Sequence, residues 1–405
     1  MPHPDRLRTP SILLLIAAGL GVQVSFAGAL LFFGLGIASL INPLEFSAYP
    51  QELIGLGWTA LVTLAVQLPV LVFASRRLNQ RPIPEWPANG LKLASIGLAV
   101  WAVALIAGAW AAEQPYAWLA LPPLQVLVVV LPLWWLVEVG RRGIRAGSQQ
   151  RTWSLLGVSL AVTVPLTLIL EIVIFGILII LLSAWLLGQP DTARQLRELV
   201  QQLQIYGPDP QILERALQPL QNQAWLRGGV LISLAGIVPL FEELLKPLAL
   251  WGMARWRLRP AEGFVAGLTC GAGFALLETL TALTSSPAEA WQMLAVQRVG
   301  TGLLHIVTTG LVGWGLATAW SRQRYLALAF AFLSAVGLHA AWNTAGLGFL
   351  PGFSGQPIPG LNLAAAQVIS LLVLMGVMLT ILFVMNRRLA GAPAEIPAMP
   401  AESLQ

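Results

Sequence analysis

The chain has 405 residues, of which 57% are hydrophobic and 10% are charged, and its mean hydropathy is +0.75. This balance excludes a soluble domain of this size and is typical of a polytopic membrane protein. The net charge of +5 comes mostly from arginines in short loops, so we expect the lipid bilayer as a partner and no nucleic acid. A single cysteine, Cys270, provides neither a disulfide framework nor a cysteine-based metal cluster.

Apolar segments of membrane-spanning length recur along the whole sequence. They predict an all-α fold, a polytopic membrane helical bundle of about ten transmembrane helices. The first and fifth segments are long enough to tilt, kink or extend beyond the bilayer. The first is also too long for the apolar part of a cleavable signal peptide. The expected spans are roughly residues 11–41, 53–74, 91–112, 116–138, 153–187, 227–252, 262–284, 298–320, 325–347 and 363–386.

The loops between these segments alternate in charge. Loops such as "AAEQPYA" and "TSSPAEAWQ" contain no lysine or arginine, whereas every second loop is basic. By the positive-inside rule, both termini are expected to be cytoplasmic, which agrees with an even number of spans. We therefore expect a multi-pass protein of the cell (plasma) membrane. The basic segments contain Arg6 and Arg8; Arg76, Arg77 and Arg81; Arg141, Arg142, Arg145 and Arg151; Arg255, Arg257 and Arg259; Arg322 and Arg324; and Arg387 and Arg388.

The chain divides into four regions with different compositions. In the loop after the fifth span, apolar residues recur at helical spacing on both sides of "YGPDP", which predicts two short amphipathic helices on the outer surface. A plain connector and a substrate-guiding cap are both compatible with this loop. The regions are an N-terminal five-helix membrane region of unknown role (1–190), the extracytoplasmic loop (191–226), a region that carries nearly all the polar chemistry (227–388) and a disordered cytoplasmic tail (389–405).

Charged residues lie inside the sixth span, "PLFEELLKPLAL". Each charge near the bilayer centre costs about 2.5–3.5 kcal/mol, so such residues indicate a function. Glu242 and Glu243 precede Lys246 by four and three residues, so the lysine is expected to neutralise one glutamate and orient the other.

The next three spans each add one ionisable residue. Glu278, His305 and His339 are each expected seven or eight residues from the outer edge, roughly 10–12 Å deep. Two histidines and one glutamate form an open catalytic zinc site in many hydrolases. Glu242 or Glu243 would then serve as general base on the bound water, and the sequence does not distinguish them. The metal's identity and its presence stay open.

Two further polar residues have more than one interpretation. Asn343 lies one turn after His339, where it would donate a hydrogen bond to a developing oxyanion or join two helices. Glu171, alone in "LTLILEIVIF", is interpreted as a structural contact between helices.

Other protease chemistries are excluded by the sequence. There is no H-E-x-x-H pattern, and no aspartate lies in a span. "GFSG" at 352–355 lies in a Gly/Pro-rich loop with no histidine after it, which favours a turn over a serine nucleophile.

The motifs "EELLK", "FALLE", a lone histidine and "HAAWN", one on each of four successive spans, resemble those of the PrsW family of intramembrane proteases. This family is related to the CAAX-prenyl proteases and bacteriocin-processing enzymes. Those relatives are closer to EExxxR with FxxxH, so a lysine four residues after the first glutamate and a glutamate in "FALLE" point to the PrsW branch. The resemblance covers roughly residues 227–347. By position, Glu242 and Glu243 match the paired glutamates, Lys246 the motif lysine, and Glu278, His305 and His339 the remaining polar positions.

The resemblance implies endopeptidase activity on membrane-anchored proteins, such as the outward-side cleavage of an anti-sigma-like factor. It also implies a metallopeptidase, although a metal-free glutamate mechanism has been argued for its relatives. Two other functions are compatible with the same side chains: a proton- or ion-coupled transporter, and a catalytically silent scaffold. The sequence does not indicate an oligomeric state.

Overall fold

The structure, a computed structural model, describes most of the chain and is helical throughout the spans. The described parts contain no β-strand, only an isolated bridge between Glu85 and Ser148. The amphipathic loop expected at 191–226 and the tail expected at 389–405 lie for the most part outside the described residues. Described are residues 5–42, 50–87, 90–145, 147–189, 224–256, 258–347 and 362–391, together with a few single residues between 190 and 223.

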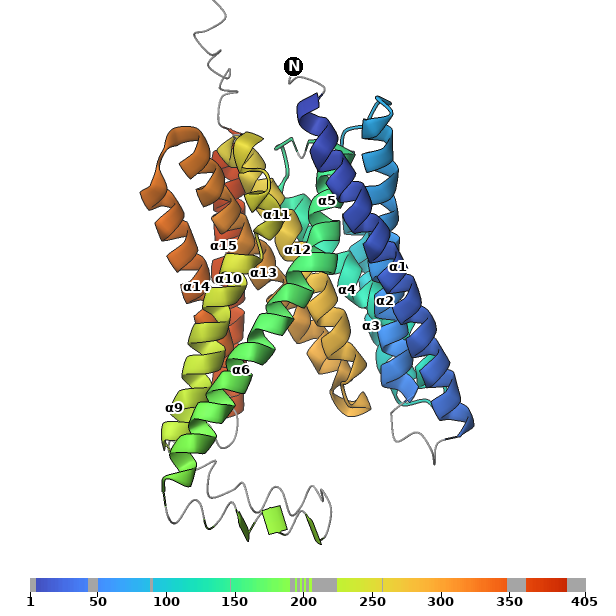
Figure 1. Cartoon of the computed structure of the whole chain (residues 1–405), viewed down its shortest axis with the longest axis vertical. Helices are drawn as coiled ribbons and strands as arrows, with labels where there is room; N and C mark the ends of the chain where they lie inside the picture. The colour runs from blue at the N-terminus through green and yellow to red at the C-terminus, as the bar shows by residue number, and fades with distance from the viewer. Residues whose placement is uncertain are drawn as a thin grey trace, which may run out of the picture.

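Within the described residues, ten helical segments are long and apolar enough to cross a membrane, which confirms the predicted all-α membrane bundle. The beginning of α1 and the end of α15 lie at the same end of the bundle (Figure 1). The elements are α1 (Asp5–Ile41), α2 (Pro50–Leu78), α3 (Gly90–Ala112), α4 (Ala117–Gly140), α5 (Gln149–Val158), η1 (Ser159–Thr163), α6 (Val164–Leu187), α9 (Ala224–Ile232), η2 (Ser233–Ile237), α10 (Val238–Leu245), α11 (Leu248–Trp251), η3 (Ala254–Trp256), α12 (Pro260–Thr284), α13 (Ala288–Arg322), α14 (Tyr325–Leu347) and α15 (Leu363–Ala390).

Two spans contain a π-helical turn, and the same residue pattern surrounds both. The sequence S-L-A-x-x-V-P-L occurs at 159–166 and again at 233–240, and its first five residues form η1 and η2. Pro165 and Pro239 lack the N–H that would close a normal α-helical turn, which loosens the backbone bonding just before them. The helices that continue after these turns, α6 and α10, contact each other.

Helices α12 and α13 form the centre of the bundle, with α1–α4 on one side and α10, α14 and α15 on the other (Figure 1). Their apolar windows are 89% buried, against at most 44% for any other described span. Gly263, Gly267 and Gly271, spaced by four residues, let the two backbones meet. A Cβ atom at Gly267 would overlap the carbonyl oxygen of Thr309, and one at Gly271 that of His305. The contact therefore fixes the backbone that carries His305.

Helix α13 begins earlier than the sequence suggested. The expected span was 298–320, but the helix extends from Ala288 to Arg322. Its first turns are drawn into the core because Trp291 is fully buried and packs against Gly108 of α3. About 25 Å of helix therefore precedes His305, more than the predicted span allowed. Arg298 lies inside the helix instead of at its boundary.

Candidate active site

The motif "EELLK" occupies the end of α10. The helix stops at Lys246 because Pro247 cannot continue its hydrogen bonding. The Lys246 side chain is fully buried, and its Nζ lies 2.6 Å from Glu243 Oε1 and 2.9 Å from Glu242 Oε2. It also lies 4.9 Å from the ring centroid of Phe274 on α12. The lysine thus contacts both glutamates, as their spacing predicts.

His339 of α14 reaches the same group of charges. Its Nδ1 lies 2.9 Å from Glu243 Oε1 and 3.3 Å from Lys246 Nζ. The shorter contact, with Glu243, suits a hydrogen bond that the Nδ1–H group of His339 donates to the carboxylate. Its other nitrogen, Nε2, lies 3.8 Å from Glu242 Oε2. His339 is therefore oriented by Glu243 and directs its free nitrogen towards Glu242.

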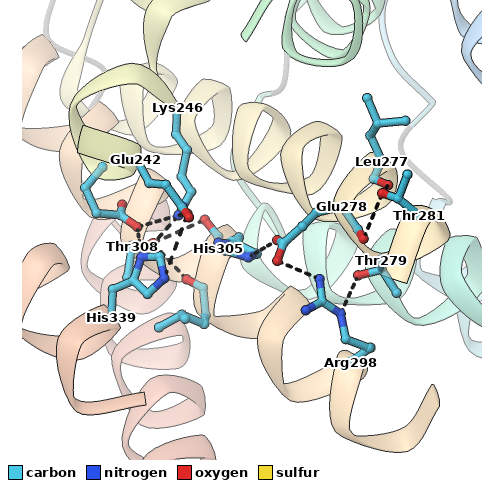
Figure 2. A network of polar contacts seen from close by, with 12 residues as sticks. Glu242, Lys246, Leu277, Glu278, Thr279, Thr281, Arg298, His305, Thr308 and His339 are labelled. Atoms are coloured by element: carbon cyan, nitrogen blue, oxygen red, sulfur yellow. Dashed lines mark hydrogen bonds and ion pairs between the residues drawn. The ribbon is translucent and has the colours of Figure 1, made fainter. Parts of the chain in front are cut away.

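His305 of α13 belongs to a second set of contacts. Its Nε2 lies 2.6 Å from Glu278 Oε2, while the other oxygen of Glu278 lies 2.9 Å from Arg298 Nη2. Arg298 Nε in turn donates to Thr279 Oγ1 at 3.3 Å. The rings of His305 and His339 meet edge to face, with centroids 5.5 Å apart. Figure 2 shows the two sets next to each other, and together they form the polar network of α10, α12, α13 and α14.

Three side chains of this network are placed to share a metal ion. Potential ligand atoms of Glu242, His305 and His339 all lie within 4.8 Å of one another, and all three residues are buried. His305 Nδ1 is buried without a hydrogen-bond partner among the described residues, as expected for a ligand atom. The opposite nitrogens of the histidines face Glu278 and Glu243, and such carboxylate–histidine pairs commonly orient metal ligands. The residues therefore fit a divalent metal held by two histidines and a glutamate.

The sequence suggested Glu278 as the third ligand, whereas the geometry favours Glu242. Glu278 is engaged by Arg298 and by His305 Nε2, which places it behind the histidine. The prediction for Asn343 stays untested. Its amide donates at 2.8 Å to the carbonyl of Leu234, in the π-helical turn η2.

Two residues that contact the site were not assigned to it from the sequence. Arg298 was assigned to a span boundary, although it lies two helical turns before His305 on the same face, a spacing that could have revealed it. Glu171 of α6 was interpreted as a structural contact between helices, and its carboxyl lies beside that of Glu242 on α10. The signal that could have assigned Glu171 to the site is its position as a lone glutamate in an apolar span. Because Arg298 is present beside Lys246, two cations instead of one offset the charges of Glu242, Glu243 and Glu278.

Comparison with known proteins agrees with this geometry. The family described as PrsW family intramembrane metalloprotease matches residues 164–382, more than half of the chain, and this range includes every residue of the network. None of the curated proteins and none of the solved structures compared with the chain gives a match. The matched region begins in α6, earlier than the start at 227 that the motifs alone suggested. Together, the ten apolar helices, the buried Glu/His/His cluster and this match show that the chain belongs to the PrsW family of intramembrane metalloproteases.

Proposed function

We propose that the chain hydrolyses peptide bonds of membrane-anchored proteins at the cluster of Glu242, His305 and His339, with zinc as the metal and Glu243 as the general base. The observation that carries this proposal is the buried convergence of the three ligand atoms directly beside Glu243. Zinc held there would polarise the scissile carbonyl and the attacking water.

Glu243 is the better candidate for the base because its two oxygens have different surroundings. Oε1 is held by Lys246 at 2.6 Å and by His339 at 2.9 Å. Oε2 is buried and has no hydrogen-bond partner among the described residues. That oxygen is free to accept a proton from water and to return it to the leaving amine. Glu242, by contrast, belongs to the three residues whose potential ligand atoms cluster, which favours the role of a ligand.

The Glu171–Glu242 contact supports Glu242 as the ligand. Two neighbouring carboxyl groups repel each other when both are ionised. A proton on Glu171 would remove this repulsion and let this residue donate a hydrogen bond to Glu242 and fix its orientation, as outer-shell groups do for ligating carboxylates. Lys246 offsets the charge of the glutamate pair, which desolvation would otherwise make costly.

Water would reach the cluster past Glu278. Its side chain is 36% exposed, whereas His305 and Lys246 are almost completely buried. We propose that substrate approaches along the part of α12 that carries Glu278, from the side that the arginine pattern predicts to be extracytoplasmic. Plasma-membrane localisation, an anti-sigma-like substrate, the role of the first 190 residues and an oxyanion role for Asn343 stay predictions.

A reconstituted cleavage assay tests the proposal. Purified full-length protein and single-span substrates would be placed in liposomes, and wild type compared with Glu243→Gln, Glu278→Gln and His339→Ala. Glu289→Gln, an exposed glutamate in the first turn of α13, is the matched control. We expect Glu243→Gln and His339→Ala to lose cleavage and Glu289→Gln to keep it. Solute flux without cleavage would instead support the transporter interpretation and overturn the proposal.

A further inference from the structure

A second feature of the molecule involves none of the residues of the polar network. It is a cavity of about 690 Å³ bounded by α3, by the end of α4 with the residues that follow it, and by the last turns of α15. Its volume is in the range of small-molecule binding pockets. The lining residues that matter here are Leu91, Trp135, Val139, Arg142, Phe383 and Arg387.

The charge of this cavity is unbalanced. Arg142 and Arg387 both line it, and neither guanidinium has a hydrogen bond or ion pair with another described residue. The neighbouring Arg141 shows the contrast, since it binds the carboxylate of Glu138 at 2.6 Å. No acidic residue lines the cavity. Two unpaired cations from separate segments thus face one space, where an anion would be bound.

The apolar part of the lining indicates what carries that anion. Helix α4 ends at Gly140 and Arg387 lies in the last turn of α15, so both arginines are at the ends of membrane spans. Phe383 precedes Arg387 by about one helical turn, and Trp135 precedes Arg142 by seven residues, so both aromatic residues lie deeper in these spans. A ligand that fits this layout has an anionic head at the membrane surface and a hydrocarbon chain inside the bilayer. Basic pockets between transmembrane helices bind anionic lipid head groups in this way.

We propose that this cavity is a binding site for an anionic phospholipid of the adjacent leaflet, with the phosphate between Arg142 and Arg387 and an acyl chain along Trp135 and Phe383. The bound lipid would join α15 to α3 and α4. Asn386, between the two regions, already donates to the carbonyl oxygens of Gly140 and Arg142 at 2.9 and 2.8 Å. The lipid would add to this connection at a helix whose apolar window is only 11% buried.

Native mass spectrometry of the full-length protein, released from nanodiscs of equal parts phosphatidylglycerol and phosphatidylcholine, tests this site. We expect wild type to retain phosphatidylglycerol at least tenfold over phosphatidylcholine, and R142Q/R387Q to lose this preference. The matched control is R145Q/R388Q, which removes the same charge from nearby exposed residues that do not line the cavity. The control should keep the preference. An equal loss in both variants would show general attraction to a basic surface and overturn the proposal.

Two additional arms keep the test decisive. Ala390→Trp fills the cavity without changing the charge and should also release the lipid, which covers the case in which the double variant fails to fold. Inorganic phosphate, added at tenfold excess over lipid, should not displace phosphatidylglycerol, because it lacks the acyl chain. Displacement by phosphate, or no preference in the wild type, would overturn the proposal of a lipid site.

Discussion

The Nδ1 atom of His339 lies 2.9 Å from the Oε1 atom of Glu243, and this contact joins α14 to α10 at the centre of the polar network. One oxygen of the glutamate thereby orients the histidine, while the other is left without a hydrogen-bond partner among the described residues. The side chain of Glu243 thus positions His339, a candidate metal ligand, and offers its Oε2 atom as a base.

Glu243→Gln should lower the rate of substrate cleavage by about 10²–10⁴-fold, the usual contribution of a general base. The amide oxygen of glutamine can still accept the hydrogen bond from His339, so zinc content at saturating zinc should stay at the wild-type level. Initial cleavage rates and metal analysis of the same preparation measure both. A variant that loses its metal would instead make Glu243 a ligand.

Metal analysis also distinguishes Glu242 from Glu278. Glu242→Gln should abolish stoichiometric zinc binding, because this residue belongs to the clustered ligand set. Glu278→Gln should only weaken zinc affinity, by about 10–100-fold, because its carboxylate contacts the far nitrogen of His305. Titration of the chelator-stripped protein with zinc checks this. The reverse order of effects would restore Glu278 as the third ligand.

Gly271→Ala should destabilise the protein by about 1–3 kcal/mol, as overpacking does in a core. The added methyl group would overlap the carbonyl oxygen of His305, and backbone cannot move aside as a side chain can. Gly337→Ala on α14 is the matched control, because a Cβ atom there meets nothing within 4 Å. Thermal unfolding in detergent compares the two. Equal unfolding midpoints for Gly271→Ala and Gly337→Ala would contradict the close contact of α12 and α13.

Asn343→Ala separates a structural from a catalytic role. Loss of the hydrogen bond to Leu234 should cost about 0.5–1.5 kcal/mol of stability. If Asn343 has only this structural role, kcat of the variant measured well below its unfolding temperature should change less than threefold. A loss of about 10²–10³-fold in kcat with unchanged stability would support the oxyanion role.

The sequence predicts well what depends on a single helix. Apolar length is enough to find the ten spans, and helical spacing brings Lys246 to both glutamates of α10. The residue types of the candidate site also follow from the rarity of charge in apolar segments, which singles out His305 and His339, and the structure brings these two together with Glu242.

What the sequence could not predict depends on how neighbouring helices are rotated against each other. Whether His305 directs Nδ1 or Nε2 into the cluster is decided by Glu278 on another helix. The choice between Glu242 and Glu278 as third ligand follows from that rotation and from Arg298. Hydropathy placed this arginine at a span boundary, because the burial of Trp291 that extends α13 is a tertiary effect.

The glycine contacts between α12 and α13 have a consequence for how a substrate enters. Two backbones in direct contact cannot slide or part without losing their packing, so this wall of the site is rigid. Any widening that admits a peptide would then involve α6 and α10, which contact each other and each follow a π-helical turn. The enzyme would thus open on one side only, and a crosslink between α6 and α10 would restrain that movement while one between α12 and α13 would change nothing.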